Sequence, residues 1–194
     1  MSGFLKPKSG NPKKRILDGT VEVFRKKGAS FTMSDISKEL GMSKKTIYTV
    51  FDDKESLLLE LVDYFFDSVK EDEEKIWNDN TLSTRDKFVK ILGAMPEASL
   101  DIDFATLYEI RDKYPTVDKK VRKRLESDWE KTLELLEKGK KEGVFRDVNP
   151  VIFQITFESA IERFINGAEL KKNHIKYGQA LAELVDTLVG GILA

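Results

Sequence analysis

The chain has 194 residues, of which 40% are hydrophobic and 35% charged, and its formal net charge is −1. A chain of this size and composition can bury a core, either as one domain or as a small domain joined to a larger one. It has no cysteine and a single histidine, which excludes disulfides, thiolate metal sites and cysteine nucleophiles. We expect no metal and no cofactor.

The charges are distributed unevenly along the chain. Residues 1–54 hold 12 of the 33 Lys and Arg residues but only 6 of the 34 Asp and Glu residues, a balance of +6 that leaves −7 for the remainder. A basic N-terminal part points to a polyanionic partner, with a chance imbalance as the plain alternative. The first residues lack the apolar segment of a signal peptide, and nowhere do about 18 apolar residues follow one another. We therefore expect a cytoplasmic protein with no membrane partner.

The first elements in chain order are a flexible stretch and two helices. Residues 1–12 contain two prolines and two glycines among lysines, which predicts a flexible basic arm. From Lys13 onward apolar residues recur at helical spacing, and Gly28 is placed to end that helix. Thr32, with Asp35 three positions later, predicts a capping box at the start of a second helix.

A third, short helix follows after a tight turn. Gly41 supplies the turn, and Ser43 is placed to cap the sequence KKTIY. Asp52 with Glu55 predicts the start of a fourth helix, which continues towards Trp77.

The rest of the chain keeps the helical periodicity. Ser83 predicts another helix start, residues 116–142 predict one long amphipathic helix, and Asn149-Pro150 is a cap followed by a first-turn proline. We find no convincing strand pattern and no repeat. The predicted fold class is all-α, with about nine helices.

The last two helices are more apolar than the others. Residues 151–168 are apolar on more than one face, which indicates burial on two sides. Such helices either fill the core of a monomer or pack against a partner chain, and we favour the partner chain. The predicted dimer interface is Phe164, Leu181, Leu184, Val185, Leu188, Val189 and Ile192.

Two lysines in the short third helix break a local rule. Lys44 and Lys45 lie in its first turn, where the helix dipole makes each cation unfavourable by about 0.3–1 kcal/mol. Residues 32–51 read as a helix-turn-helix, whose second helix places its N-terminal residues in the major groove of DNA. Phosphate would therefore offset the penalty. The predicted DNA-binding residues are Thr32, Ser43, Lys44, Lys45, Thr46, Tyr48 and Lys54.

The segment TMSDISKELGMSKKTIYTVFDDKESLL resembles the DNA-binding signature of the TetR family of bacterial transcriptional regulators. Ser37 stands where alanine is usual, and Val50 stands where an aromatic residue or histidine is common, which would remove one bond to a phosphate. The resemblance covers about the first third of the chain. The matching positions are Thr32, Ile36, Gly41, Ser43, Ile47, Tyr48, Phe51, Lys54 and Leu57.

The resemblance implies an organisation and a function. After the arm 1–12, residues 13–53 would form a three-helix DNA-binding domain, and residues 54–194 a helical effector-binding and dimerisation domain. Members of the family are mostly repressors that leave DNA when a small molecule binds. The resemblance therefore implies a homodimeric repressor on a pseudo-palindromic, double-stranded operator, which reads the major groove and is released by an unknown small-molecule effector.

The effector site is the least specified part of the sequence. Twelve phenylalanines favour a bulky hydrophobic effector, although an aromatic stripe can equally be plain core. The candidate lining residues are Phe88, Leu92, Met95, Phe104, Leu107, Tyr108, Trp129, Leu133, Phe153, Phe157 and Ile161.

Two other functions compete with a ligand-responsive repressor. An effector-independent DNA-binding protein would use its C-terminal domain to recruit a protein partner, and a solid core without a cavity would favour it. An enzyme would have to rely on carboxylates such as Glu109 and Asp112, which fall on a charged helical pattern and are better explained as surface ion pairs. We therefore expect that the protein is not an enzyme.

Overall fold

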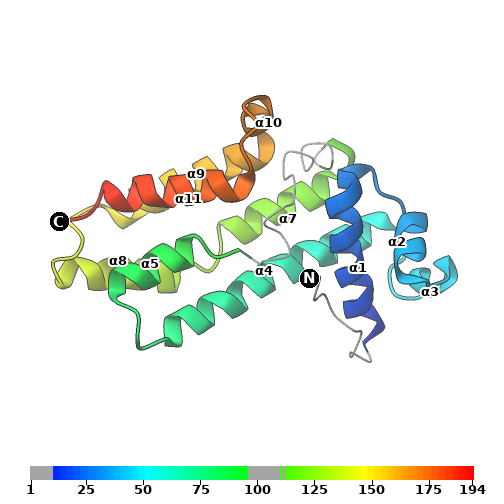
Figure 1. Cartoon of the computed structure of the whole chain (residues 1–194), viewed down its shortest axis with the longest axis horizontal. Helices are drawn as coiled ribbons and strands as arrows, with labels where there is room; N and C mark the ends of the chain where they lie inside the picture. Colours follow the sequence, from blue (N-terminus) through cyan, green and yellow to red (C-terminus); the bar gives the residue numbers. More distant parts are fainter. Residues whose placement is uncertain (1–10, 96–109, 111) are drawn as a thin grey trace.

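The computed structural model describes residues 11–95, 110 and 112–194 (Figure 1). Over this part of the chain the fold is all-α, as predicted, and extended pairing is limited to one isolated bridge between Phe145 and Leu193. Most of the predicted arm, three pocket candidates (Phe104, Leu107 and Tyr108) and Glu109 lie outside the described residues. The helices are α1 (Pro12–Lys27), the 3-10 helix η1 (Gly28–Ser30), α2 (Met33–Leu40), α3 (Lys44–Tyr48), α4 (Lys54–Asn78), α5 (Thr84–Leu92), α7 (Pro115–Leu125), α8 (Glu130–Lys141), α9 (Pro150–Asn166), α10 (Glu169–Lys172) and α11 (Tyr177–Gly190).

Local capping chemistry starts α2 as predicted. The Thr32 hydroxyl accepts a hydrogen bond from the Asp35 backbone N–H at 3.3 Å, and the Asp35 carboxylate accepts one from the Thr32 N–H at 2.8 Å. Gly41 ends the helix with φ 60° and ψ 30°, in the left-handed region that favours glycine.

The caps of the next two helices agree with the sequence in one case and differ in the other. Ser43 caps α3 by accepting a hydrogen bond from the Thr46 N–H at 3.1 Å. The predicted Asp52 cap of α4 is wrong by one residue, because Asp53 forms the capping box with Ser56.

Helices α1, α2 and α3 form a compact unit, called here the head, around a core that includes Ile16, Ile36 and Ile47. This core does not end where the predicted domain boundary falls. Leu57 and Leu58 of α4 and Val117 of α7 belong to the same cluster of buried side chains. The first turns of α4 are therefore part of the packing of the head.

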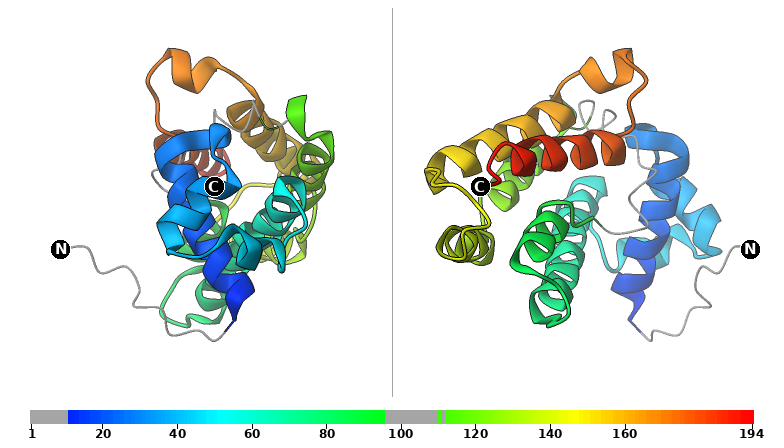
Figure 2. Two further views of the ribbon diagram at one scale, coloured as in Figure 1. Left: turned by 90° about the vertical axis from the view of Figure 1, so that its right-hand side faces the viewer. Right: turned by 60° about the vertical axis from the view of Figure 1, so that its left-hand side comes forward.

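The remaining helices, called here the body, surround a second core. The rings of Phe88, Phe145 and Phe153 lie at its centre, with centroid separations of 5.0 Å (Phe88 to Phe145) and 5.4 Å (Phe88 to Phe153). Helices α9 and α11 lie side by side along one flank of the body, and the short α10 projects beside them (Figure 2). Among the described helices, none is both long and apolar enough to cross a membrane.

Helix α4, 25 residues long, runs from the head into the body (Figure 1). Three acidic residues of α4 form ion pairs with basic residues that each lie 57 positions later: Asp63 with Lys120, Asp67 with Arg124 and Glu74 with Lys131. The separation is constant, whereas it would shrink along an antiparallel pair. The ion pairs therefore follow two segments that run in the same direction, α4 and α7–α8.

The predicted single helix over residues 116–142 is wrong, because the chain breaks between α7 and α8. Asp128 adopts φ 64° in the break, and its carbonyl accepts a hydrogen bond from the Lys70 ammonium of α4 at 3.0 Å. The Trp129 indole N–H donates to the Leu125 carbonyl at 3.1 Å. Neither Gly nor Pro marks this position, and the apolar spacing continues across it, so sequence periodicity does not reveal the break.

Candidate nucleic-acid interface

The head presents α3 on its outer side. Ile47 is fully buried and anchors the helix, whereas Lys44, Lys45 and Thr46 are exposed. Tyr48 is 46% exposed. The five-residue helix is thus attached through one side and leaves its predicted DNA-binding residues accessible.

Helices α1 and α2 pack closely beside α3. A Cβ atom at Gly19 of α1 would overlap the end of the Leu40 side chain of α2, so a larger residue at this position would require that side chain to move. The Arg15 guanidinium donates to the Leu40 carbonyl at 3.0 Å, which satisfies a backbone acceptor at the end of α2. The orientation of the turn that leads into α3 follows from these contacts.

The lysines of α3 differ from the lysines of α1 in their partners. On α1, Lys13 pairs with Glu60 at 2.7 Å, and Lys26 and Lys27 pair with carboxylates of α2 at 2.7 and 2.6 Å. Lys44 and Lys45 form no ion pair with any described residue. Within the part of the chain that the structure describes, the lysines of α1 are therefore ion-paired and those of α3 are not.

Lys38 is a further exposed cation beside this surface that sequence reasoning did not identify. It lies in the last turn of α2 and, like Lys44, has no ion-pair partner among the described residues. The available signal was its position three residues before Gly41, at the edge of the helix-turn-helix.

Lys54, predicted to contact DNA, has a different role. Its ammonium group donates to the Ala29 carbonyl at 2.8 Å and to the Phe31 carbonyl at 2.5 Å. Burial lowers the pKa of the Lys54 ammonium, and the nearby charge of Lys113 lowers it further. Lys54 therefore ties the start of α4 to the segment between α1 and α2, and its contact with phosphate stays a prediction.

The hydroxyls predicted near DNA are used within the head. Thr32 and Ser43 cap α2 and α3, and the Thr46 hydroxyl lies 2.9 Å from the Ser43 hydroxyl. Hydrogen bonds from Lys27 and then Thr32 hold the pKa of the Asp35 carboxyl well below its usual range. Hydrogen bonds from the backbone and side chain of Ser56 likewise lower the pKa of Asp53. Both carboxylates thus stay ionised within their capping boxes.

The predicted dimer interface requires a correction. Leu181, Val185, Val189 and Ile192 are buried inside their own chain, so they are not available to a partner. Phe164, Leu184 and Leu188 are half-buried against the same core. The periodicity identifies the apolar stripe of α11 correctly, and its buried residues face the body of the same chain. Contact of Phe164, Leu184 and Leu188 with a partner chain stays a prediction.

The exposed apolar surface lies on α9 instead. Val151, Ile152 and Ile155 are 56%, 61% and 52% exposed, and they share the outer side of the first turns of that helix. We refer to these three residues as the α9 patch. The double-sided apolar character of residues 151–168 was the sequence signal for it.

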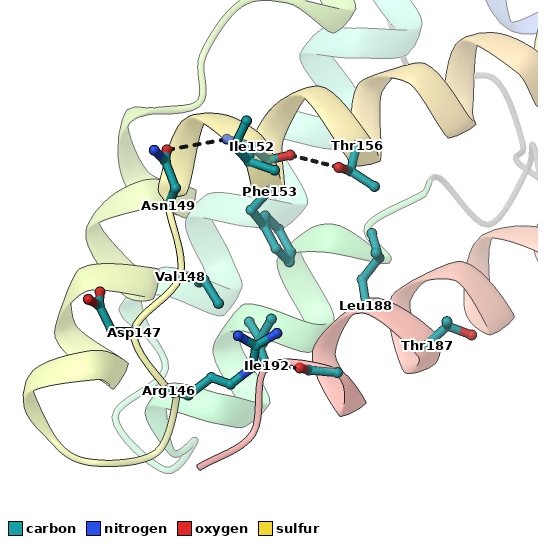
Figure 3. Close-up of a pocket in the computed structure, with 11 residues that line it drawn as sticks. Arg146, Asp147, Val148, Asn149, Ile152, Phe153, Thr156, Thr187, Leu188 and Ile192 are labelled. Atoms are coloured by element: carbon teal, nitrogen blue, oxygen red, sulfur yellow. Dashed lines mark hydrogen bonds between the residues drawn. The ribbon is translucent and has the colours of Figure 1, made fainter.

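A hollow of about 450 Å³ adjoins the α9 patch near the C-terminus (Figure 3). Phe153 of α9 and Leu188 of α11 face it from opposite sides, and Arg146 lies beside Ile192. The Arg146 guanidinium also donates to the Gly191 carbonyl at 2.8 Å. Of the predicted effector-pocket residues that the structure describes, Phe153 alone lines this hollow.

Most of the other predicted pocket residues lie in the body core. Phe88, Leu92 and Ile161 are buried there, and Met95, Trp129 and Phe157 pack against it. Leu133 is half-buried on α8. The structure therefore brings these side chains together as packing, while the part of the pocket expected from residues 104–108 lies outside the described residues.

Fold and site together define a helix-turn-helix transcriptional regulator. The family model of bacterial regulatory proteins of the tetR family matches residues 16–61, which span α1 to the first turns of α4. Residues 16–61 therefore carry the DNA-binding signature of the TetR family of bacterial regulators.

Similarity to known proteins extends over nearly the whole chain. The HTH-type transcriptional regulator YvaF of Bacillus subtilis (strain 168) is 29% identical over 185 residues, covering 93% of this chain and 95% of that protein. The crystal structure of the regulatory protein TetR from Rhodobacter sphaeroides has a TM-score of 0.72 at 16% identity, covering 93% of this chain and 98% of that one. The fatty acid degradation regulator FadR from Bacillus halodurans has a TM-score of 0.63 at 21% identity, covering 95% and 98%. At these identities the two structures establish the fold of the body as well as that of the head.

Proposed function

We propose that this chain acts as a homodimeric repressor that binds a pseudo-palindromic operator through α3. The observation that carries the proposal is the contrast between lysines: those of α1 are paired within the protein, and Lys44 and Lys45 are exposed without an ion-pair partner among the described residues. A helix-turn-helix places such residues against phosphates and base edges of the major groove. Lys38 extends the same surface. In the complex, DNA phosphates act as the anionic partners of Lys44 and Lys45.

The proposed dimer uses the α9 patch in place of the α11 stripe. Three large apolar side chains more than half exposed on one helix face are unusual unless a partner covers them. Two heads on one duplex require half-sites spaced by about 34–36 Å or a multiple of one helical turn. A second copy packed on the α9 patch would hold the two heads on one assembly.

Release by a small apolar molecule forms part of the proposal, with one rival. The close packing of Phe88, Phe145 and Phe153 favours the rival, a DNA-binding regulator that has no effector and recruits a protein partner through its body. Under the repressor proposal, a ligand must bind more tightly to the state that has left the operator. Operator release by added ligands in a binding assay supports the repressor, and release by none of a broad panel supports its rival.

The test starts with selection of bound duplexes from a random library. The parent protein should select a two-fold symmetric site, and Lys44→Ala with Lys45→Ala should abolish this selection while helical content stays unchanged. The salt dependence of the residual binding should fall by about 0.9 in slope for each phosphate that the variant no longer neutralises. Selection of the same site by the double variant would show that α3 is not the reading element.

Lys119 and Lys123 provide the matched control. Both are exposed on α7 without an ion-pair partner among the described residues, so changing both to alanine removes the same charge from the body. This control should keep operator selection. Equal losses in the two double variants would point to general charge attraction and away from recognition by α3.

A further inference from the structure

The surface that α3 exposes contains two threonines, and the second lies just beyond the predicted site residues. Thr46 belongs to α3 and Thr49 is its C-terminal cap, and both are exposed. They are three positions apart, so their side chains are neighbours on the helix surface. Ile47, between them in sequence, points into the head core, which leaves both threonines on the accessible side.

Both threonine hydroxyls are occupied within the helix itself. The Thr46 hydroxyl lies 2.9 Å from the Ser43 hydroxyl, and the Thr49 hydroxyl donates to the Thr46 carbonyl at 2.7 Å. A β-branched side chain has few allowed rotamers, so fixing the hydroxyl also fixes the methyl group. Each hydroxyl therefore already has a hydrogen-bond partner within the head, whereas each methyl group forms no such bond.

We propose that the methyl groups of Thr46 and Thr49 read the C5-methyl groups of thymines in the operator. Thymine is the base that presents a methyl group in the major groove, and the threonine methyl is one of the groups that contacts it. The Cβ atoms of residues three apart lie about 5–6 Å from each other, and successive base pairs are about 3.4 Å apart. The pair thus spans the same or adjacent base steps, with Lys44 and Lys45 beside it for phosphate or guanine. This inference rests on the proposed function, because it names what the same surface recognises.

Deoxyuridine provides the test, because it differs from thymidine only in lacking the methyl group. In the selected operator, each thymine is replaced in turn and the Kd of the parent protein is measured. Replacement of a thymine that contacts the pair should raise the Kd of the parent protein about four-fold, the equivalent of one buried methyl group. An operator in which no thymine is sensitive would overturn the proposal.

Paired variants separate the methyl group from the hydroxyl. Thr46→Ser and Thr49→Ser keep the hydroxyl and its hydrogen bond, so each should weaken the parent operator about four-fold and abolish the deoxyuridine effect at its own thymine. Thr46→Val and Thr49→Val keep the methyl groups and should preserve that effect. The reverse pattern, in which serine retains and valine loses recognition, would show contact through the hydroxyl and refute the methyl reading.

The two levels of the proposal fail differently. Absence of any sequence-selective binding by the parent protein would refute the regulator, and this proposal with it. If the protein binds DNA selectively but its response to deoxyuridine does not depend on Thr46 and Thr49, the proposed regulator function stands. Only the proposed contacts between these threonines and thymine are then refuted. Circular dichroism of each variant establishes that the head is folded.

Discussion

The ammonium group of Lys54 lies 4.0 Å from the centroid of the Phe31 ring, on the inner side of the head. Together with its hydrogen bonds to the Ala29 and Phe31 carbonyls, this contact joins the start of α4 to the segment that precedes α2. The cation thus serves the position of α4, and its net effect on DNA is expected to be indirect.

Replacement of Lys54 by methionine should therefore reduce stability and leave phosphate contacts unchanged. The variant keeps the alkyl stem and removes the donor for two carbonyls, which should cost about 1–3 kcal/mol. For a chain of this size this corresponds to a fall in Tm of roughly 2–12 °C, measured by thermal denaturation. The salt slope of operator binding should stay that of the parent. An unchanged Tm together with a weaker salt dependence of operator binding would show that Lys54 contacts phosphate.

The capping box at Asp35 should contribute to stability in a pH-dependent way. Hydrogen bonds from Lys27 and Thr32 lower the pKa of Asp35 in the folded chain, whereas the unfolded chain titrates near 3.9. Since the unfolded state then binds more protons in acid, the contribution is complete above about pH 4 and is lost as the pH falls through the lower folded pKa. Asp35→Asn should lower Tm at neutral pH and flatten its fall between about pH 4 and pH 2.

Lys27→Met gives an independent check on the cause of this shift. Lys27 supplies the largest part of the lowered Asp35 pKa, so its removal should flatten the acid limb of the Tm profile in the same direction as Asp35→Asn. Acid profiles that match the parent in both variants would show that the box does not couple folding to pH.

The α9 patch should determine dimerisation. Ile152→Glu with Ile155→Glu places two charges on side chains that the body does not cover, so the subunit should stay folded while the dimer Kd rises about 100-fold or more. Sedimentation equilibrium measures the association, and thermal denaturation the fold. A charge at Leu188 is a poorer test, because Leu188 also packs against the core of its own chain.

Asn80→Glu is the control for this prediction. Asn80 is exposed in the turn between α4 and α5, away from α9, so a charge there should leave association unchanged. A monodisperse dimer of the Ile152 and Ile155 double variant would contradict the proposed interface.

The features that the sequence predicts correctly here depend on neighbouring residues. Thr32 with Asp35 and Ser43 with Thr46 are partners within three positions, so their geometry follows from short-range backbone chemistry. The fold class follows in the same way from periodicity. The family signature rests on the same short segment, which explains why the amino-acid sequence alone outlines the head.

The features that the sequence does not reveal depend on partners that are distant in sequence. The carbonyls that bind Lys54 lie 23 and 25 positions earlier, and no local rule associates them with the start of α4. The apolar spacing of α11 is real, but the sequence does not show which apolar residues the body buries. In the folded chain Val185 of α11 is buried and Ile152 of α9 is exposed. Asp128 breaks a helix without a glycine or proline, because Lys70 of another helix holds its carbonyl.

We expect helix α4 to act as a lever between the body and the head. With 25 residues it is about 37 Å long. A tilt of about 5° about its C-terminal end, in the body, therefore moves its N-terminal end, in the head, by about 3 Å. That displacement is close to the rise of about 3.4 Å between base pairs. We therefore expect a small tilt of α4 in the body to be enough to shift α3 by nearly one base step along the groove.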